Sequence, residues 1–174
     1  MTALAITNGE WVISKNHRNI FHVRDDRERF NDLTRGKVVV YGINTLETLP
    51  NKKPLVGRKN IILTHNRNVR IEGATTVGNL EELRYVLKSY DTDDIYLIGG
   101  AQIFSQLIDD CKTAVLTVVD DETGGNPEEY EYFPDLSQRP NWIPGKTSSD
   151  HFCEGHCWRY VTYTNLRFRK HGQK

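Results

Sequence analysis

The chain has 174 residues, of which 37% are hydrophobic and 26% are charged, and its 23 basic residues balance 23 acidic ones. A chain of this size can bury roughly 70% of its unfolded surface, so it can form one good core. This composition excludes a disordered chain, a collagen-like chain and a disulfide-dense miniprotein. The balanced charge also argues against a nucleic-acid-binding protein, which usually carries an excess of basic residues.

No internal repeat, low-complexity tract or linker rich in Gly, Pro or Ser divides the sequence. We therefore expect a single domain over residues 1–174, with 167–174 as a solvated tail. The first residues lack the basic and long apolar segments of a signal peptide, and no apolar run reaches the roughly 20 residues of a membrane helix. The three cysteines are an odd number, which is typical of reduced thiols. We expect a cytoplasmic monomer with a small-molecule substrate and no nucleic-acid or membrane partner.

Strands and helices alternate along the first two thirds of the chain. In chain order, the sequence predicts a strand at 4–7, a helix at 25–33, a strand at 38–41, a short helix at 45–49, a strand at 60–64, a helix at 80–90, a strand at 95–98, a helix at 101–108 and a strand at 114–119. Several of the strands are apolar throughout, as parallel strands covered on both faces must be. The alternation indicates βαβ units and an α/β fold with a mainly parallel sheet.

The last part of the chain follows a different pattern. His151-Phe-Cys153 and the run 158–164 flank Glu154-Gly155, which predicts an antiparallel hairpin that closes the edge of the sheet. The same region holds four possible soft-metal ligands, His151, Cys153, His156 and Cys157. Their spacing matches no usual zinc motif, and alternate residues of a strand point to opposite faces. We therefore expect no metal site.

Two strand-to-helix turns contain glycine where a phosphate group could bind. One is Val40-Tyr-Gly42-Ile-Asn-Thr45 and the other is Leu97-Ile-Gly99-Gly100-Ala-Gln102. Free backbone N–H groups at a helix N-terminus bind anions, and glycine lets the backbone come close to the ligand. Neither turn is a known dinucleotide or nucleotide motif, so each alone is a weak signal.

These turns belong to a longer series of segments in a fixed order. The series is Trp11-Val-Ile-Ser14, Asp25-Asp26-x-x-x-Phe30, the run 33–42, Thr45-Leu-Glu-Thr-Leu49, the run 54–64, the run 95–104, Leu116-Thr117-x-x-Asp120 and Tyr132-Phe133-Pro134. In this order and spacing the chain resembles the dihydrofolate reductase family over almost its whole length. The resemblance implies a mainly parallel eight-stranded sheet flanked by helices, and reduction of 7,8-dihydrofolate to 5,6,7,8-tetrahydrofolate by hydride transfer from NADPH.

The resemblance also assigns roles to individual residues. Asp26 corresponds to the single active-site carboxylate, Thr117 to its hydrogen-bond partner, and Phe21 to the active-site loop. Arg58 corresponds to the arginine that pairs with the α-carboxylate of the substrate, a task suited to a planar fork of donors. The implied substrate pocket is Leu4, Ala5, Ile6, Asp26, Arg27, Phe30, Leu49, Arg58, Ile98 and Thr117. The implied NADPH site is Ile13, Gly42, Ile43, Asn44, Thr45, Leu63, Thr64, His65, Gly99, Gly100, Ala101, Gln102, Ile103 and Phe104.

The expected chemistry needs few polar side chains because the nicotinamide supplies the hydride and the protein orients two rings. A carboxylate at the far edge of the pterin favours the protonated N5 that accepts hydride at the adjacent C6. From the residues alone, Asp26 is more typical of a solvent-facing acid at the start of a helix. The resemblance further implies a cis peptide bond between Gly99 and Gly100.

The chain departs from the family pattern at the cofactor. Ile43 stands where the family has a basic partner of the 2′-phosphate. Thr64 and His65, with Asn66 and Arg67 beyond them, are the remaining candidates for that phosphate, and we expect a smaller preference for NADPH over NADH. Two alternative functions stay open: a pyrimidine reductase of riboflavin synthesis with the same architecture, and a degenerate homologue that binds nucleotide without turnover.

Overall fold

The computed structural model describes residues 1–66, 68–153 and 155–169. The strands are β1 (Thr2–Asn8), β2 (Val12–Lys15), β3 (Arg18–Asn19), β4 (Val38–Gly42), β5 (Lys59–Leu63), β6 (Ala74–Val77), β7 (Ile95–Gly99), β8 (Thr113–Val119), β9 (Tyr130–Tyr132), β10 (Trp142–Thr147), β11 (His151–Cys153) and β12 (His156–Asn165). The helices are α1 (Arg24–Thr34), α2 (Ile43–Leu46), α3 (Leu80–Leu87) and α4 (Ala101–Leu107), with 3-10 turns at Pro50–Lys52, Thr92–Asp94, Ile108–Asp110, Pro127–Glu129 and Leu136–Gln138.

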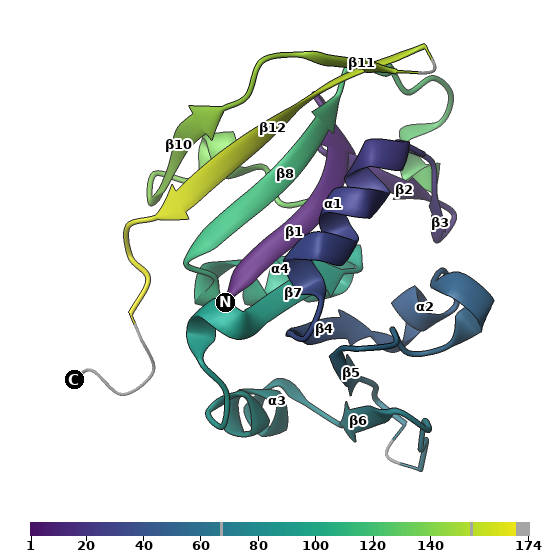
Figure 1. Ribbon diagram of the computed structural model, residues 1–174, viewed down its shortest axis with the longest axis vertical. Coiled ribbons are helices and arrows are strands. Elements are labelled where there is room, and N and C mark those ends of the chain that lie inside the picture. The colour runs from purple at the N-terminus through teal and green to yellow at the C-terminus, as the bar shows by residue number, and fades with distance from the viewer. Residues whose placement is uncertain (67, 154, 170–174) are drawn as a thin grey trace.

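One large twisted sheet carries most of the chain (Figure 1). Its order is β10-β12-β8-β1-β7-β4-β5-β6, and β11 pairs with β12 beyond the end of β10. The strands from β8 to β6 are parallel to their neighbours, whereas β12 runs antiparallel to β8 and β10. The predicted fold class, a mainly parallel sheet with an antiparallel C-terminal edge, is confirmed.

Both faces of the sheet are covered, which explains the apolar runs in the sequence. Along β4, Val38 and Val40 join the core cluster that includes residues of α3 and α4. Val39 and Tyr41 point to the opposite face and pack in the cluster that includes Leu46 of α2. Helix α1 lies on that same side of the molecule, over β1 and β8 (Figure 1). Because successive side chains of a strand point to opposite faces, the apolar residues of β4 pack in two separate layers.

Helix α3 begins as its sequence predicts. The side chain of Asn79 accepts a hydrogen bond of 2.8 Å from the backbone N–H of Glu82, and the Glu82 carboxylate accepts one of 2.7 Å from Gly78 N. This reciprocal arrangement satisfies one free N–H group of the first helical turn and the N–H group of the residue before the N-cap, as a close relative of the capping box.

The predicted strands and helices are confirmed with small changes at their ends. The short helix α2 starts two residues earlier than predicted, directly after Gly42, and ends at Leu46 rather than at residue 49. Helix α3 ends at Leu87 rather than at residue 90. Sequence analysis missed β6, β10 and a second sheet of three short strands in the order β3-β2-β9. The predicted hairpin is present as β11 and β12, although β10 forms most of the outer edge. Of the predicted tail, residues 170–174 lie outside the described residues.

Candidate active site

A cleft of about 640 Å³ opens at the carboxyl ends of β4, β5 and β7 and extends along β1 to α1. This is the edge where parallel α/β sheets bind ligands, because strands give way to loops and helix N-termini there. The residues predicted for the site line this cleft, with two exceptions, Thr117 and Arg58.

Asp26 sits in the first turn of α1, with its side chain facing the sheet. The hydroxyl of Thr117 on β8 donates a hydrogen bond to the Asp26 carboxylate. Thr117 is fully buried beneath the cleft, so its hydroxyl belongs to the support of Asp26 rather than to the cleft wall. Asp25, the neighbouring acid, is exposed. The two adjacent carboxylates therefore differ in their surroundings: Asp26 is hydrogen-bonded by Thr117, whereas Asp25 faces solvent.

Burial raises the pKa of the Asp26 carboxyl above its ordinary value. The hydrogen bond from Thr117 and the positive charge of Arg29 act in the opposite direction and lower it. The surrounding cleft wall is largely apolar and includes Ile6, Phe30 and Ile98. A carboxyl group with a raised pKa in an apolar cleft is a frequent sign of a functional site.

The two glycine turns lie side by side because β4 and β7 are paired, with Tyr41 opposite Gly99. A Cβ atom on Gly42 would lie 2.9 Å from Cγ1 of Ile103, so only glycine fits this approach of β4 to α4. Gly99 has a φ of +123°, in the region that favours glycine, and the Gly99–Gly100 peptide is cis as predicted. The turns therefore present bare backbone to the same end of the cleft.

The sequence matches the dihydrofolate reductase family over residues 1–164. The chain belongs to this family. It is 29% identical to dihydrofolate reductase type 3 of Salmonella typhimurium over 135 residues, which cover 78% of this chain and 76% of that protein. It is 32% identical to the Neisseria gonorrhoeae dihydrofolate reductase over 122 residues, 70% of each chain. The family match confirms the predicted enzyme class, dihydrofolate reductase.

A solved structure has the same fold. Dihydrofolate reductase from Enterococcus faecalis, complexed with NADP(H) and RAB-propyl, has a TM-score of 0.81 and 24% identity, with 94% of this chain and 95% of that chain covered. At this identity the likeness establishes the fold.

Arg58, the predicted partner of the substrate carboxylate in a dihydrofolate reductase, lies next to the cleft. Its Nε donates to the Thr34 hydroxyl at 3.2 Å, and its Nη2 donates to Oδ1 of Asn31 at 2.7 Å. A further bond of 2.8 Å joins Nη1 to the backbone oxygen of Val56. Asn31 lines the cleft and Arg58 is bonded to it, so the guanidinium is anchored just behind the cleft wall.

Sequence analysis missed eleven lining residues, five of which lie in the segment 14–23 before α1. Among them, Glu131 of β9 accepts a hydrogen bond from the Ser14 hydroxyl and pairs with His17. All three residues line the cleft, so Glu131 ties the β2–β3 turn to the rest of the molecule. No motif marks this cluster; the only signal is that Glu131 directly precedes the Tyr132-Phe133-Pro134 segment.

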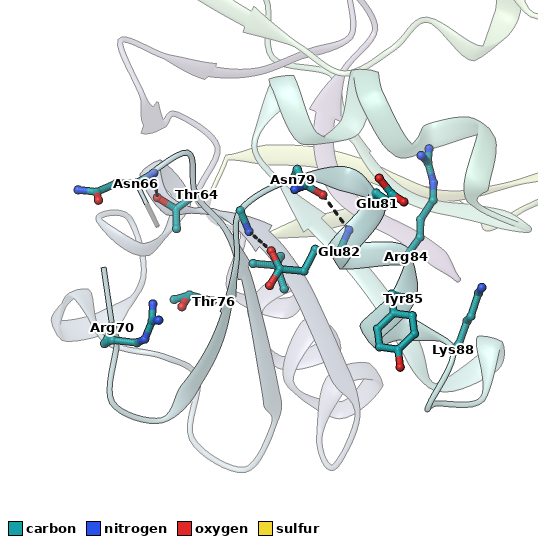
Figure 2. Close-up of a pocket in the computed structure, with 12 residues that line it drawn as sticks. Thr64, Asn66, Arg70, Thr76, Asn79, Glu81, Glu82, Arg84, Tyr85 and Lys88 are labelled. Carbon is teal, nitrogen blue, oxygen red and sulfur yellow. Dashed lines mark hydrogen bonds between the residues drawn. The ribbon is translucent and has the colours of Figure 1, made fainter. Parts of the chain in front are cut away.

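A second cavity of about 860 Å³ adjoins the first at the ends of β5 and β6 (Figure 2). Thr64 lines both cavities. Its hydroxyl accepts a hydrogen bond of 3.3 Å from the backbone N–H of Asn66. Figure 2 shows Asn66 next to Thr64, with Glu82 and Asn79 turned inward to cap α3. Arg67, the charged candidate for the 2′-phosphate, lies outside the described residues.

The two histidines of the C-terminal hairpin have other partners, and its two cysteines are free thiols. His156 Nδ1 lies 2.9 Å from a carboxylate oxygen of Asp121, and the His151 ring stacks on Trp158 with 5.7 Å between centroids. Within the described residues, no three His, Cys, Asp or Glu side chains converge as metal ligands would. In the same parts of the chain, no helix has the length and apolar character needed to span a bilayer.

Proposed function

We propose that the chain reduces 7,8-dihydrofolate to 5,6,7,8-tetrahydrofolate in the cleft between α1 and the ends of β4 and β7, with Asp26 as its active-site carboxylate. The observation that supports this most directly is the half-buried Asp26, hydrogen-bonded by Thr117 at an apolar cleft. A spectrophotometric assay of NADPH oxidation with dihydrofolate tests it. Oxidation that requires dihydrofolate supports the proposal, whereas nucleotide binding without turnover would favour the degenerate homologue.

Asp26 binds the polar edge of the pterin, and the apolar wall orients the ring. Leu4, Ala5, Ile6, Phe30, Leu49 and Ile98 form this wall in our proposal. The wall contacts the ring on its apolar faces, so the ring has one polar anchor, and that anchor is negative. A fixed negative charge in a poorly solvated site stabilises the cation formed when N5 gains its proton. Phe21 and Arg27 bound the cleft on the side of α1.

The two glycine turns fit a nucleotide cofactor, because both line the cleft and bring bare backbone and the start of α4 to one end of it. When bound, NADPH supplies the hydride. We assign its binding to the predicted residues of these turns, to Ile13, and to Leu63, Thr64 and His65 at the end of β5. Backbone N–H groups at the start of α4 lack partners within the helix and are free to donate to phosphate oxygens.

The cofactor preference should respond to position 43. Ile43 offers a phosphate only its backbone, so we expect Ile43→Arg to raise the ratio of kcat/KM with NADPH to that with NADH about ten- to a hundredfold. The reason is that a charge-assisted hydrogen bond contributes roughly 1.5–3 kcal/mol. Ile43→Leu, which adds no charge, is the matched control. A ratio that does not move with arginine would show that the 2′-phosphate lies elsewhere.

Glu131 should support cofactor binding by holding the β2–β3 turn. Glu131→Ala removes the acceptor shared by Ser14 and His17, and we expect KM for NADPH to rise roughly threefold to tenfold, in line with about 1 kcal/mol for a half-exposed bond. Glu129→Ala is the control, because it removes an exposed pair with Lys15 from the same region and should change KM less than twofold. Equal effects of both substitutions would contradict a specific role of Glu131.

We also propose that residues 1–174 form one domain. In support, the central strand β1 comes from the start of the chain and its neighbour β8 pairs with β12 from the end. Neither part can complete the sheet alone. The cytoplasmic location, the monomeric state and the absence of nucleic-acid and membrane partners stay predictions.

A further inference from the structure

Helix α1 places a second ionisable side chain on the face that carries Asp26. Arg29 follows Asp26 by three residues, so the two side chains project from the same side of the helix, towards the sheet. Arg29 is half-buried, and its guanidinium carbon lies 4.1 Å from the centroid of the Tyr160 ring on β12. The cation therefore lies over the face of an aromatic ring, which we call its platform, instead of extending into solvent.

The platform is tied to the support of the carboxylate. In the antiparallel pairing of β8 and β12, Tyr160 lies directly opposite Thr117. Directly opposed residues point to the same face of a sheet, so both side chains meet α1. Thr117 contacts Asp26 and Tyr160 contacts Arg29, one helical turn further along. The helix and the sheet thus make two adjacent polar contacts on one face.

The guanidinium of Arg29 has no counter-ion in contact among the described residues. Its Nη1 atom is buried and makes no hydrogen bond to any described residue, and within the described residues no carboxylate forms an ion pair with it. By contrast, Arg24 on the exposed side of the same helix pairs with Glu28. A desolvated cation without an ion pair exerts its field on the nearest buried charge more strongly than a solvated one does.

We propose that Arg29 is a positioning residue for the reduction: its guanidinium, fixed on the face of Tyr160, supplies the positive charge that keeps the buried Asp26 carboxylate ionised. The proposal rests on the role of Asp26 proposed above. This role explains why the Arg29 guanidinium is partly removed from water although no counter-ion contacts it. It also identifies what offsets the cost of burying Asp26, together with the hydrogen bond from Thr117.

Other titratable groups lie on α1 and on the segment before it. His22, Asp25, Arg27 and Asp32 are exposed, His22 and Arg27 line the cleft, and Arg24 and Glu28 pair with each other on the exposed side. From β11, His151 packs against the Tyr160 ring with 5.1 Å between centroids. Across the cleft, His17 and Glu131 pair with each other. Arg29 differs from His151 because it projects from α1 three residues after Asp26, and it differs from the remaining groups by its contact with Tyr160.

The test is an NMR titration of the Asp26 carboxyl carbon in the ligand-free protein, which needs no turnover. Arg29→Met keeps the length of the side chain and removes its charge, and we expect the apparent pKa of Asp26 to rise by about one, a tenfold change in proton affinity. Arg29→Lys keeps the charge, so it should raise the apparent pKa of Asp26 by less than half of the rise expected in Arg29→Met. Arg24→Met makes the same change of net charge on the exposed side of α1. It should leave the apparent pKa of Asp26 within about 0.2 of the parent value.

The pH profile of kcat/KM gives the second readout. Arg29→Met should displace this profile to higher pH, because it raises the apparent pKa of Asp26. When Asp26→Asn is already present, adding Arg29→Met should no longer displace the profile, because Asn does not ionise. An Asp26 pKa that is unchanged in Arg29→Met would overturn the proposal, even if Asp26 proves essential for activity. If Arg29→Met does not fold, Tyr160→Leu removes the platform and should raise the same pKa; an unchanged value there would overturn the proposal as well.

Discussion

Asp26→Asn should lower kcat/KM for dihydrofolate at pH 7 by at least about a hundredfold, the usual contribution of a positioned acid–base group. The amide keeps the shape of the carboxylate and can still accept the hydrogen bond from Thr117, so the main change is the loss of negative charge. Without that charge, protonation of N5 in the cleft becomes less favourable. At acid pH the solution supplies the proton, and the loss should therefore be smaller.

The same substitution should stabilise the folded protein. Burial raises the pKa of Asp26 above that of an unfolded carboxyl group, so the folded state binds this proton more tightly. The free energy of unfolding therefore falls as the pH rises from the unfolded to the folded pKa of Asp26. Above the folded pKa the loss of stability is complete. Asn does not ionise, so we expect a higher melting temperature than the parent at pH 7, with the difference vanishing below the pKa of the unfolded carboxyl.

Asp25→Asn is the matched control, since Asp25 is the exposed neighbour on the same helical turn. It should change kcat/KM less than twofold and leave the pH profile in place. An equal loss of activity at every pH in Asp26→Asn would assign that residue to binding or folding instead. A lower melting temperature would contradict the burial argument independently of the kinetics.

The parts of the fold that could be predicted from the sequence are those in which one physical requirement dominates. β4 is apolar at four successive positions because both its faces are covered, and the start of α3 is marked by the reciprocal bonds of Asn79 and Glu82. β3 and β9 have only two and three residues and are polar or exposed, so no periodicity marks them. They exist because β2 pairs with both, a long-range contact that local sequence does not encode.

The candidate site also contains residues that could be predicted from the sequence and residues that could not. The glycine turns stand out in the sequence because glycine is required where β4 and α4 approach, as the 2.9 Å contact at Gly42 shows. Asp26 is indistinguishable from any helix-start acid until the fold brings Thr117 to it from 91 residues away. Arg29 reads as a solvated helix residue for the same reason, because its platform, Tyr160, is distant in the sequence. Pairing across the sheet, rather than residue type, makes these side chains functional.

Arg58→Leu should raise KM for dihydrofolate about ten- to a hundredfold and change kcat far less. A contact with the α-carboxylate lies remote from the reacting atoms, so it binds the substrate and the transition state equally and its loss appears in KM. The magnitude follows from roughly 1.5–3 kcal/mol for a hydrogen bond to a charged group. Arg58→Lys keeps the charge but loses the planar fork, and we expect an intermediate rise.

The structural bonds of Arg58 make a second substrate necessary in this experiment. Arg58 also donates to Thr34, Asn31 and Val56, so its replacement loosens the junction between α1 and β5 even without substrate. A dihydropterin that lacks the α-carboxylate separates the two effects: if Arg58 recognises that group, the variant and the parent should have the same KM for this shorter substrate. An equal rise in KM for both substrates would show that Arg58 acts through the junction alone, since a lost carboxylate contact cannot weaken the binding of a molecule that has none.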